Sequence, residues 1–160
     1  KRPHLYLDLA ESLPEEEFLL VGPAGNDKSY TDQIATRAEG MTNVTYLGPV
    51  DPEAIHQYYE RAIALVNTSA FEGFPITFIE AWRYDTPVVT LSIDVNRFVD
   101  SSEQLPFADD DFETLVRIVE QLADDPTERA RLSAPTKDYF DHNLTLDSVV
   151  EQYERILDNL

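Results

Sequence analysis

Four short apolar runs in the first 91 residues constrain the fold of this chain more than any other feature. Each is of strand length, and each is followed by glycine, proline, serine or asparagine; they are Phe18–Val21, Val44–Leu47, Ala62–Val66 and Val88–Leu91. Runs this apolar are typical of parallel strands that are covered on both faces. We therefore predict a sheet of buried, mostly parallel strands.

Helical patterns fill the intervals between these runs and the rest of the chain. They cover Pro3–Ser12, Pro52–Ala62, Ile76–Arg83, Asp111–Ala123, Pro126–Phe140 and Leu146–Leu157. The segment Ser133-Ala134-Pro135 could break the fifth of these helices. Strands alternating with helices predict one α/β domain over residues 1–160, with a doubly wound, mostly parallel sheet flanked by helices. In such sheets, ligands bind beyond the carboxyl ends of the strands, here after residues 21, 47, 67 and 91.

Composition excludes several classes of partner and chemistry. The chain has 31 acidic and 12 basic residues, a net charge of −19, and no cysteine. Such a surface repels nucleic acid and anionic lipid, so we expect neither as a partner. Without cysteine there is no disulfide, thiolate nucleophile or cysteine zinc site. No apolar run reaches 18 residues, so the sequence predicts no membrane span.

The acidic excess, with only three lysines against nine arginines, favours a halophilic source. High ionic strength screens repulsion between carboxylates, which also keep the surface hydrated. The alternative is an acidic domain from an ordinary organism. A melting temperature that does not rise in molar KCl would exclude the halophilic interpretation.

The loop after the third run carries the residues best suited to bind a ligand. Gly73 allows the backbone to approach a ligand closely. Pro75 suits the start of a helix, whose first amides, those of Ile76, Thr77 and Phe78, would form a site for a diphosphate. Glu72 could accept hydrogen bonds from sugar hydroxyls, and Glu80, one turn inside the helix, could hold a ribose diol.

Each of these features also has a simpler interpretation. A Gly-Phe-Pro turn before a helix is often only a turn, and Glu80 could be a solvated surface position. The spacing of the two glutamates, with seven residues between them, favours the binding site.

These residues resemble the pattern of glycosyltransferase family 4, whose members have the two-domain GT-B fold. The motif comprises Ser69, Glu72-Gly73-Phe74-Pro75 and Glu80-Ala81, followed by Thr86-Pro87-Val88-Val89. The opening Lys1-Arg2-Pro3-His4-Leu5 resembles the basic segment that begins the family's C-terminal domain, and the resemblance extends over nearly the whole chain. It implies the Rossmann-like C-terminal half of a GT-B enzyme, with the N-terminal acceptor-binding domain absent.

The resemblance also implies a role for each matching residue. Glu72 and Lys1 would be the catalytic residues: Glu72 binds hydroxyls of the donor sugar, and Lys1 neutralises the distal phosphate as the leaving group forms. The remaining donor-binding positions would be Gly22 at a strand end, Gly73, Phe74 and Pro75 around the sugar, Ile76 and Thr77 on the diphosphate, Glu80 on the ribose, and Val50 and Asp51 at the base.

Two departures from the family pattern concern the phosphate and the sugar. The arginine that usually partners the basic lysine would precede Lys1. The family's glycines after the Pro-Val-Val strand are missing, because that segment reads Ser92-Ile93-Asp94-Val95-Asn96-Arg97-Phe98. Arg97 could substitute as a phosphate ligand, although a surface arginine is the simpler interpretation.

The implied activity is that of a cytoplasmic hexosyltransferase that moves a sugar from a nucleoside diphosphate with retention of configuration and without a metal or other cofactor. The full enzyme could be peripheral to a membrane. We expect the 160-residue chain to bind the donor but not to transfer the sugar. The alternatives are a sugar-nucleotide epimerase or phosphorylase of the same fold, or a non-catalytic nucleotide-sugar-binding module.

Overall fold

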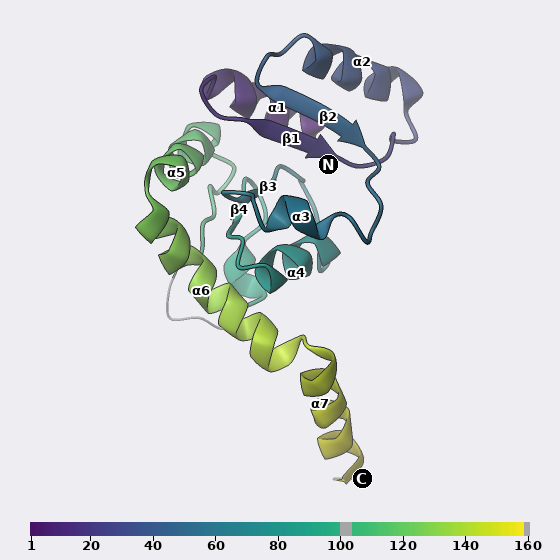
Figure 1. Cartoon of the computed structure of the whole chain (residues 1–160), viewed down its shortest axis with the longest axis vertical. Helices are drawn as coiled ribbons and strands as arrows, with labels where there is room; N and C mark the ends of the chain where they lie inside the picture. The colour runs from purple at the N-terminus through teal and green to yellow at the C-terminus, as the bar shows by residue number, and fades with distance from the viewer. Residues whose placement is uncertain (100–103, 159–160) are drawn as a thin grey trace.

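Parallel strands flanked by helices make up the fold of this chain (Figure 1). The computed structural model describes residues 1–99 and 104–158. Within them, strand β1 (Phe18–Val21) pairs with β2 (Val44–Gly48), and β3 (Leu65–Asn67) pairs with β4 (Val88–Thr90). Both pairs are parallel, which confirms the predicted α/β class.

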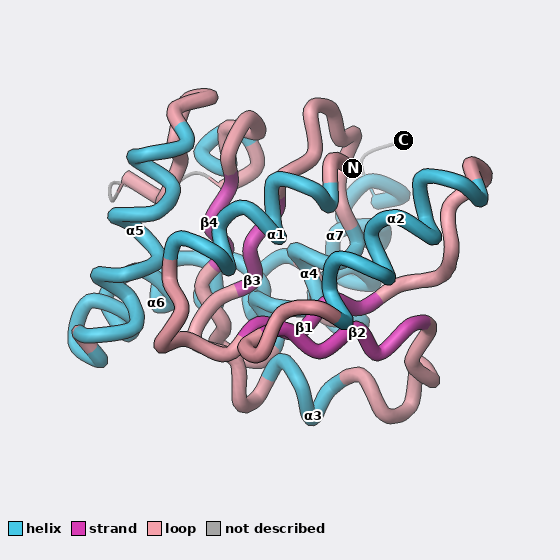
Figure 2. The backbone as a smooth tube through the Cα atoms, turned by 90° about the horizontal axis from the view of Figure 1, so that it is seen from above, coloured by secondary structure: helices cyan, strands magenta, loops and turns pink. Residues whose placement is uncertain are grey.

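The described part of the chain contains seven α-helices. They are α1 (Pro3–Ser12), α2 (Lys28–Glu39), α3 (His56–Tyr59), α4 (Ile76–Arg83), α5 (Phe112–Asp124), α6 (Pro126–Asn143) and α7 (Leu146–Asp158). Helix α7 extends away from the strands beyond the end of α6 (Figure 1). Helices α1 and α2 lie beside the β1–β2 pair, and α4 lies beside β3 and β4 (Figures 1 and 2). None of these helices is long and apolar enough to span a membrane.

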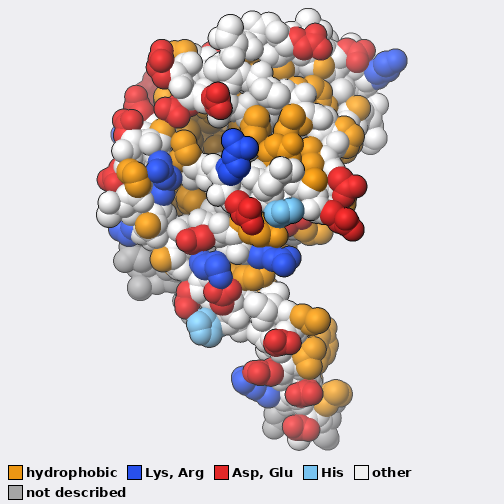
Figure 3. Space-filling view, viewed as in Figure 1, with side chains coloured by type: hydrophobic (Ala, Val, Ile, Leu, Met, Phe, Trp, Pro, Cys, Tyr) orange, Lys and Arg blue, Asp and Glu red, His pale blue; other side chains and the backbone are white. Residues whose placement is uncertain are grey.

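Two buried clusters hold these elements together. One joins α1, α2 and α5 to the β1–β2 pair and to β4, through residues such as Leu7, Phe18, Val89 and Leu115. The other lies under α4 and contains Tyr59, Phe78, Trp82 and Leu105. Helix α7 belongs to neither cluster: no residue of it is buried, and hydrophobic side chains are visible along its side in Figure 3.

Most predicted elements are observed, with three main differences. Helix α2 was not predicted, because it buries only Ile34 and Ala38; Asp27 begins it by accepting a hydrogen bond from the Tyr30 amide at 3.0 Å. The helix predicted over Pro52–Ala62 shrinks to α3, because Asp51 instead caps a turn of residues 51–55. The third strand begins at Leu65 rather than Ala62, whose amide bonds the Tyr59 carbonyl.

Pro135 does not break α6, which continues to Asn143. Leu132, Ser133 and Thr136 are buried around the proline, and α6 packs against α4. This tertiary packing offsets the backbone hydrogen bond that proline cannot donate.

Candidate functional site

The predicted binding loop, residues 67–75, connects the carboxyl end of β3 directly to α4. Thr68 and Ser69 are buried at its beginning, whereas Gly73 and Phe74 are exposed near its end. The Phe74 ring is anchored by edge contacts with Trp82 and Phe98, at 6.2 and 5.2 Å between centroids. The loop is therefore fixed to the core at both ends, and its middle faces solvent beyond the strand end.

Glu72 is the one carboxylate of this loop. It forms an ion pair with Lys1 and accepts a hydrogen bond from the Asn67 amide at 3.3 Å. Its side chain is 11% exposed, whereas that of Lys1 is 72% exposed. Burial raises the pKa of Glu72, but hydrogen bonds from Lys1, Ser69 and Asn67, with the Lys1 charge, lower it below the ordinary value. Glu72 is therefore an ionised acceptor at neutral pH.

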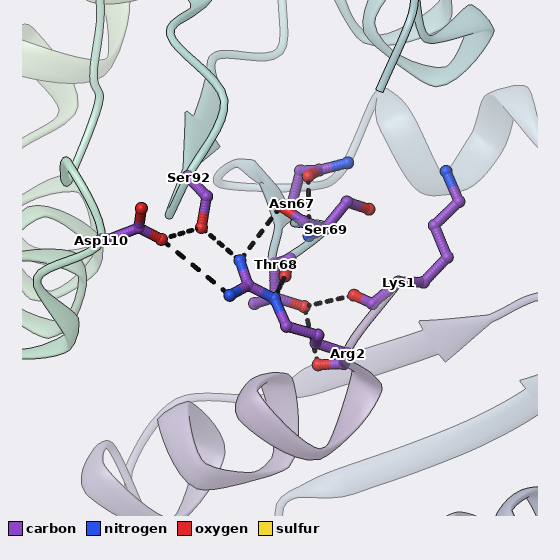
Figure 4. Close-up of polar contacts among 7 residues, drawn as sticks. All are labelled: Lys1, Arg2, Asn67, Thr68, Ser69, Ser92 and Asp110. Carbon is purple, nitrogen blue, oxygen red and sulfur yellow. Dashed lines mark hydrogen bonds and ion pairs between the residues drawn. The ribbon is translucent and has the colours of Figure 1, made fainter. Parts of the chain in front are cut away.

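Arg2 fixes the position of the segment that carries Lys1 (Figure 4). Its Nε donates to the Thr68 carbonyl at 2.7 Å and its Nη2 to the Ser69 carbonyl at 3.1 Å. Its guanidinium also donates to the Ser92 hydroxyl and lies 3.9 Å from Asp110. The planar guanidinium presents five N–H donors in a rigid fork, whereas the three donors of an ammonium rotate about a single nitrogen and cannot reproduce this geometry.

The Thr68 hydroxyl completes this arrangement by donating to the carbonyls of Lys1 and Arg2, at 3.1 and 3.0 Å. The loops after β3 and β4 are thereby tied to the first two residues of the chain. No role of Arg2 or Asn67 was predicted from the sequence. The one feature of the sequence that could have drawn attention to Arg2 is its place beside Lys1, since two adjacent basic residues are unusual in so acidic a chain.

The start of α4 offers main-chain amides to solvent. Pro75 is the N-cap residue, and no side chain caps the helix there. Ile76 is 71% exposed, and Thr77 is exposed as well. The Phe78 amide was predicted to be available for a ligand, but it bonds the Pro75 carbonyl at 3.0 Å. This tightened first turn leaves the amides of Ile76 and Thr77 as the two anion-binding donors.

Glu80 lies on the same face of α4 as Ile76, four residues earlier. The Cα–Cβ bond of a helical residue is tilted toward the helix N-terminus, which is the end of α4 that carries the uncapped amides. The Glu80 carboxylate accepts a hydrogen bond from the Tyr59 hydroxyl at 2.9 Å. Along the chain, Glu72 thus precedes the start of α4 and Glu80 follows it.

The glycines at the ends of β1 and β2 are adjacent. The Gly22 amide donates to the Gly48 carbonyl at 2.9 Å, and φ is +146° at Gly22 and +65° at Gly48. Other residues rarely adopt such angles, so the turn requires glycine at both positions. Beyond these glycines, Val50 is half-buried. The Asp51 carboxylate accepts a hydrogen bond from the main-chain amide of Glu53 at 2.8 Å. A base contact by Val50 or Asp51 stays a prediction.

The segment without the family's glycines has a structure of its own. Val95–Arg97 form a short 3-10 helix. Asp94 caps this helix, because its carboxylate accepts a hydrogen bond from the main-chain amide of Asn96 at 3.0 Å. The side-chain oxygen of Asn96 accepts a hydrogen bond from the main-chain amide of Leu105 at 2.8 Å. Arg97 is exposed, as the simpler interpretation expected.

This architecture is shared with solved structures of glycosyltransferases. The TM-score is 0.79 with Anabaena HepE, crystallised with UDP and glucose, at 18% identity over 100% of this chain and 45% of that one. It is 0.77 with a variant of S. aureus TarM, crystallised with UDP, at 20% identity over 97% and 32%. The fold is therefore that of the C-terminal half of GT-B enzymes.

Sequence comparison gives the family. The sequence model of the family "glycosyl transferases group 1" matches residues 1–138, so the chain belongs to this family. It is 22% identical to a glycosyltransferase 1 domain-containing protein of Xenopus tropicalis, over 94% of this chain and 43% of that protein. With the D-inositol 3-phosphate glycosyltransferase of Mycolicibacterium smegmatis it is 26% identical, over 98% and 38%. The chain thus spans less than half the length of these relatives.

Proposed function

We propose that this chain is the donor-binding domain of a retaining glycosyltransferase and that it binds a UDP-sugar. One observation carries the proposal: a carboxylate, an uncapped helix start and a second carboxylate follow one another at the carboxyl end of β3. Family membership and the UDP in the related HepE and TarM structures support the choice of nucleotide.

Each group in this arrangement would bind one part of the donor. Ionised Glu72 accepts hydrogen bonds from sugar hydroxyls. The amides of Ile76 and Thr77 donate to the diphosphate at the positive end of α4. Glu80 accepts hydrogen bonds from the ribose hydroxyls. Gly73 and Phe74 line the sugar, and Val50 and Asp51 lie toward the base.

During transfer, the bond between the anomeric carbon and the distal phosphate oxygen breaks, the oxygen of the acceptor hydroxyl bonds the same face of the sugar, and the proton of that hydroxyl passes to the departing diphosphate. Negative charge develops on the departing diphosphate and positive charge on the sugar ring. Lys1 would neutralise the former. Its ammonium is exposed beside Glu72, so it can turn toward the phosphate without unburying its side chain. No metal is required in this scheme.

We further propose that the 160-residue chain binds the donor without transferring the sugar, since the acceptor-binding domain would supply the other wall of the site. Sustained turnover by the purified chain would contradict this part of the proposal. The absence of glycine between Ser92 and Phe98 instead favours a non-catalytic binding module. Product analysis with the full-length protein separates transfer, epimerisation and phosphorolysis from binding alone.

Calorimetric titration with UDP, GDP and their glucose conjugates tests the binding site. Glu80→Ala should weaken UDP binding about tenfold or more, because a hydrogen bond to a charged group is lost. Glu72→Ala should leave UDP affinity unchanged and remove the additional affinity for UDP-glucose. Glu120→Ala, at an exposed position on α5, is the matched control. Equal affinities of all four proteins for UDP, and likewise for UDP-glucose, would refute the site.

A further inference from the structure

We propose that Tyr59 is a positioning residue for Glu80, and that its hydroxyl holds the carboxylate in the orientation needed to bind ribose hydroxyls. This inference rests on the proposed function, since it concerns how the nucleotide part of the donor is bound. It adds a residue from α3, outside the loop and helix to which the motif belongs.

The contact is direct. The Tyr59 hydroxyl donates to Oε2 of Glu80 at 2.9 Å and joins α3 to α4 across 21 positions of sequence. Among the described residues, Tyr59 is the one side chain that donates to Glu80. A glutamate on a helix surface otherwise samples several rotamers, and fixing one of them before binding lowers the entropic cost of the complex.

Tyr59 is itself held rigidly. Its side chain is buried, and its ring stacks on that of Tyr84 with 4° between the planes and 6.3 Å between centroids. The Thr86 hydroxyl donates to the Tyr59 carbonyl at 2.8 Å and fixes the backbone. The packing of the core therefore determines where the phenolic oxygen of Tyr59 lies. The Glu80 carboxylate is held in place by its hydrogen bond to this oxygen.

The direction of the hydrogen bond is also determined. Burial, together with the neighbouring Glu80 carboxylate, raises the pKa of the Tyr59 hydroxyl above its ordinary value. Tyr59 consequently stays protonated and donates. Its proton occupies part of Oε2, and Oε1 remains to accept hydrogen bonds from a ribose diol.

The test compares UDP with 2′,3′-dideoxy-UDP, which lacks both ribose hydroxyls, by calorimetry on the 160-residue chain. Tyr59→Phe should weaken UDP binding about three- to tenfold and leave the affinity for the dideoxy nucleotide unchanged. If Tyr59 had only a structural role, Tyr59→Phe would weaken the binding of both nucleotides equally. In the Glu80→Ala background, Tyr59→Phe should have no further effect on UDP, because the group it positions is gone.

Tyr58→Phe is the matched control, because it removes the same hydroxyl from the neighbouring position of α3. It should change neither affinity. Tyr59→Phe keeps the stacked ring, and its melting curve, read by circular dichroism, checks that the fold is retained. Should the variant melt early, the double-variant comparison at low temperature still measures the coupling between Tyr59 and Glu80.

The outcomes separate this inference from the proposed function. If Glu80→Ala weakens UDP binding but Tyr59→Phe does not, the inference about Tyr59 is overturned and the proposed function stands. No binding of UDP or of the dideoxy nucleotide by the unsubstituted chain would overturn both.

Discussion

Glu72 and Glu80 are eight positions apart in sequence, yet different physical forces hold them in place. Glu72 lies on a loop and is fixed by polar partners far away in the chain: Lys1 bonds it directly, and Arg2 bonds the loop that carries it. Glu80 lies on a helix whose opposite face is apolar, with Phe78 and Trp82 fully buried. Charged and polar contacts therefore hold the sugar end of the site, whereas packing orients the helix at the nucleotide end, where the hydroxyl of the buried Tyr59 adds a polar contact to the carboxylate.

The two ends should therefore respond to different perturbations. Hydrophobic contacts are insensitive to pH and not weakened by salt, so the orientation of α4 should persist where ion pairs fail. The Lys1–Glu72 pair is partly exposed, and its contribution should fall with acid or added salt. Substitutions that weaken one end alone provide the sharpest test of this division.

The largest effect is expected at Trp82, under the nucleotide end. Its ring meets Phe74, Phe78 and Tyr139 at 6.1 to 6.2 Å. Trp82→Ala should lower the free energy of unfolding by about 3–5 kcal/mol, because it leaves a cavity in the core. Urea unfolding followed by far-ultraviolet circular dichroism measures the change.

Trp82→Phe is the control for this substitution. It keeps most of the ring and removes an indole N–H that is buried without a hydrogen-bond partner among the described residues. The loss of stability should therefore be clearly smaller than for alanine. Equal losses for both variants would show that packing under α4 is not what Trp82 provides.

A smaller effect is expected at Arg2, beneath the sugar end. Arg2→Ala deprives the Thr68 and Ser69 carbonyls of their donor, and should lower the free energy of unfolding by about 1–3 kcal/mol. Arg2→Lys should lie in between, because an ammonium cannot make the forked contact. Arg61→Ala, at an exposed position, should have little effect. Full recovery by lysine in urea unfolding would mean that charge alone matters.

The smallest effect concerns the titration of Glu72. Lys1→Met removes a hydrogen bond and a positive charge, so the pKa of Glu72 should rise from its lowered value. In the unsubstituted chain, stabilisation by Glu72 is present above the ordinary carboxyl pKa and is lost as pH falls through the lowered one. Lys1→Met should shift that loss to higher pH. NMR titration follows Glu72; Lys28→Met serves as control, and identical curves for all three proteins would contradict the pairing.

Local sequence was sufficient for several elements. The predicted bounds of α1, β1 and α4 agree with the structure, because apolar spacing, together with a proline at the start of α1 and of α4, acts within the element itself. Local signals failed at α2, which has few buried residues, and in the region 52–62, where the Asp51 turn competes with the helix.

The sequence alone also indicated the family, the loop with Glu72 and the helix with Glu80, since these depend on residue types at fixed short spacing. Their partners come from elsewhere in the chain: Arg2 and Lys1 reach residues 68 to 72, and Tyr59 reaches Glu80 from another helix. Helix α7 makes the same point, because its apolar spacing predicted a helix, yet the described residues bury none of its side chains. Short-range spacing determines which elements form, whereas long-range contacts depend on how those elements pack, and only the tertiary structure shows that packing.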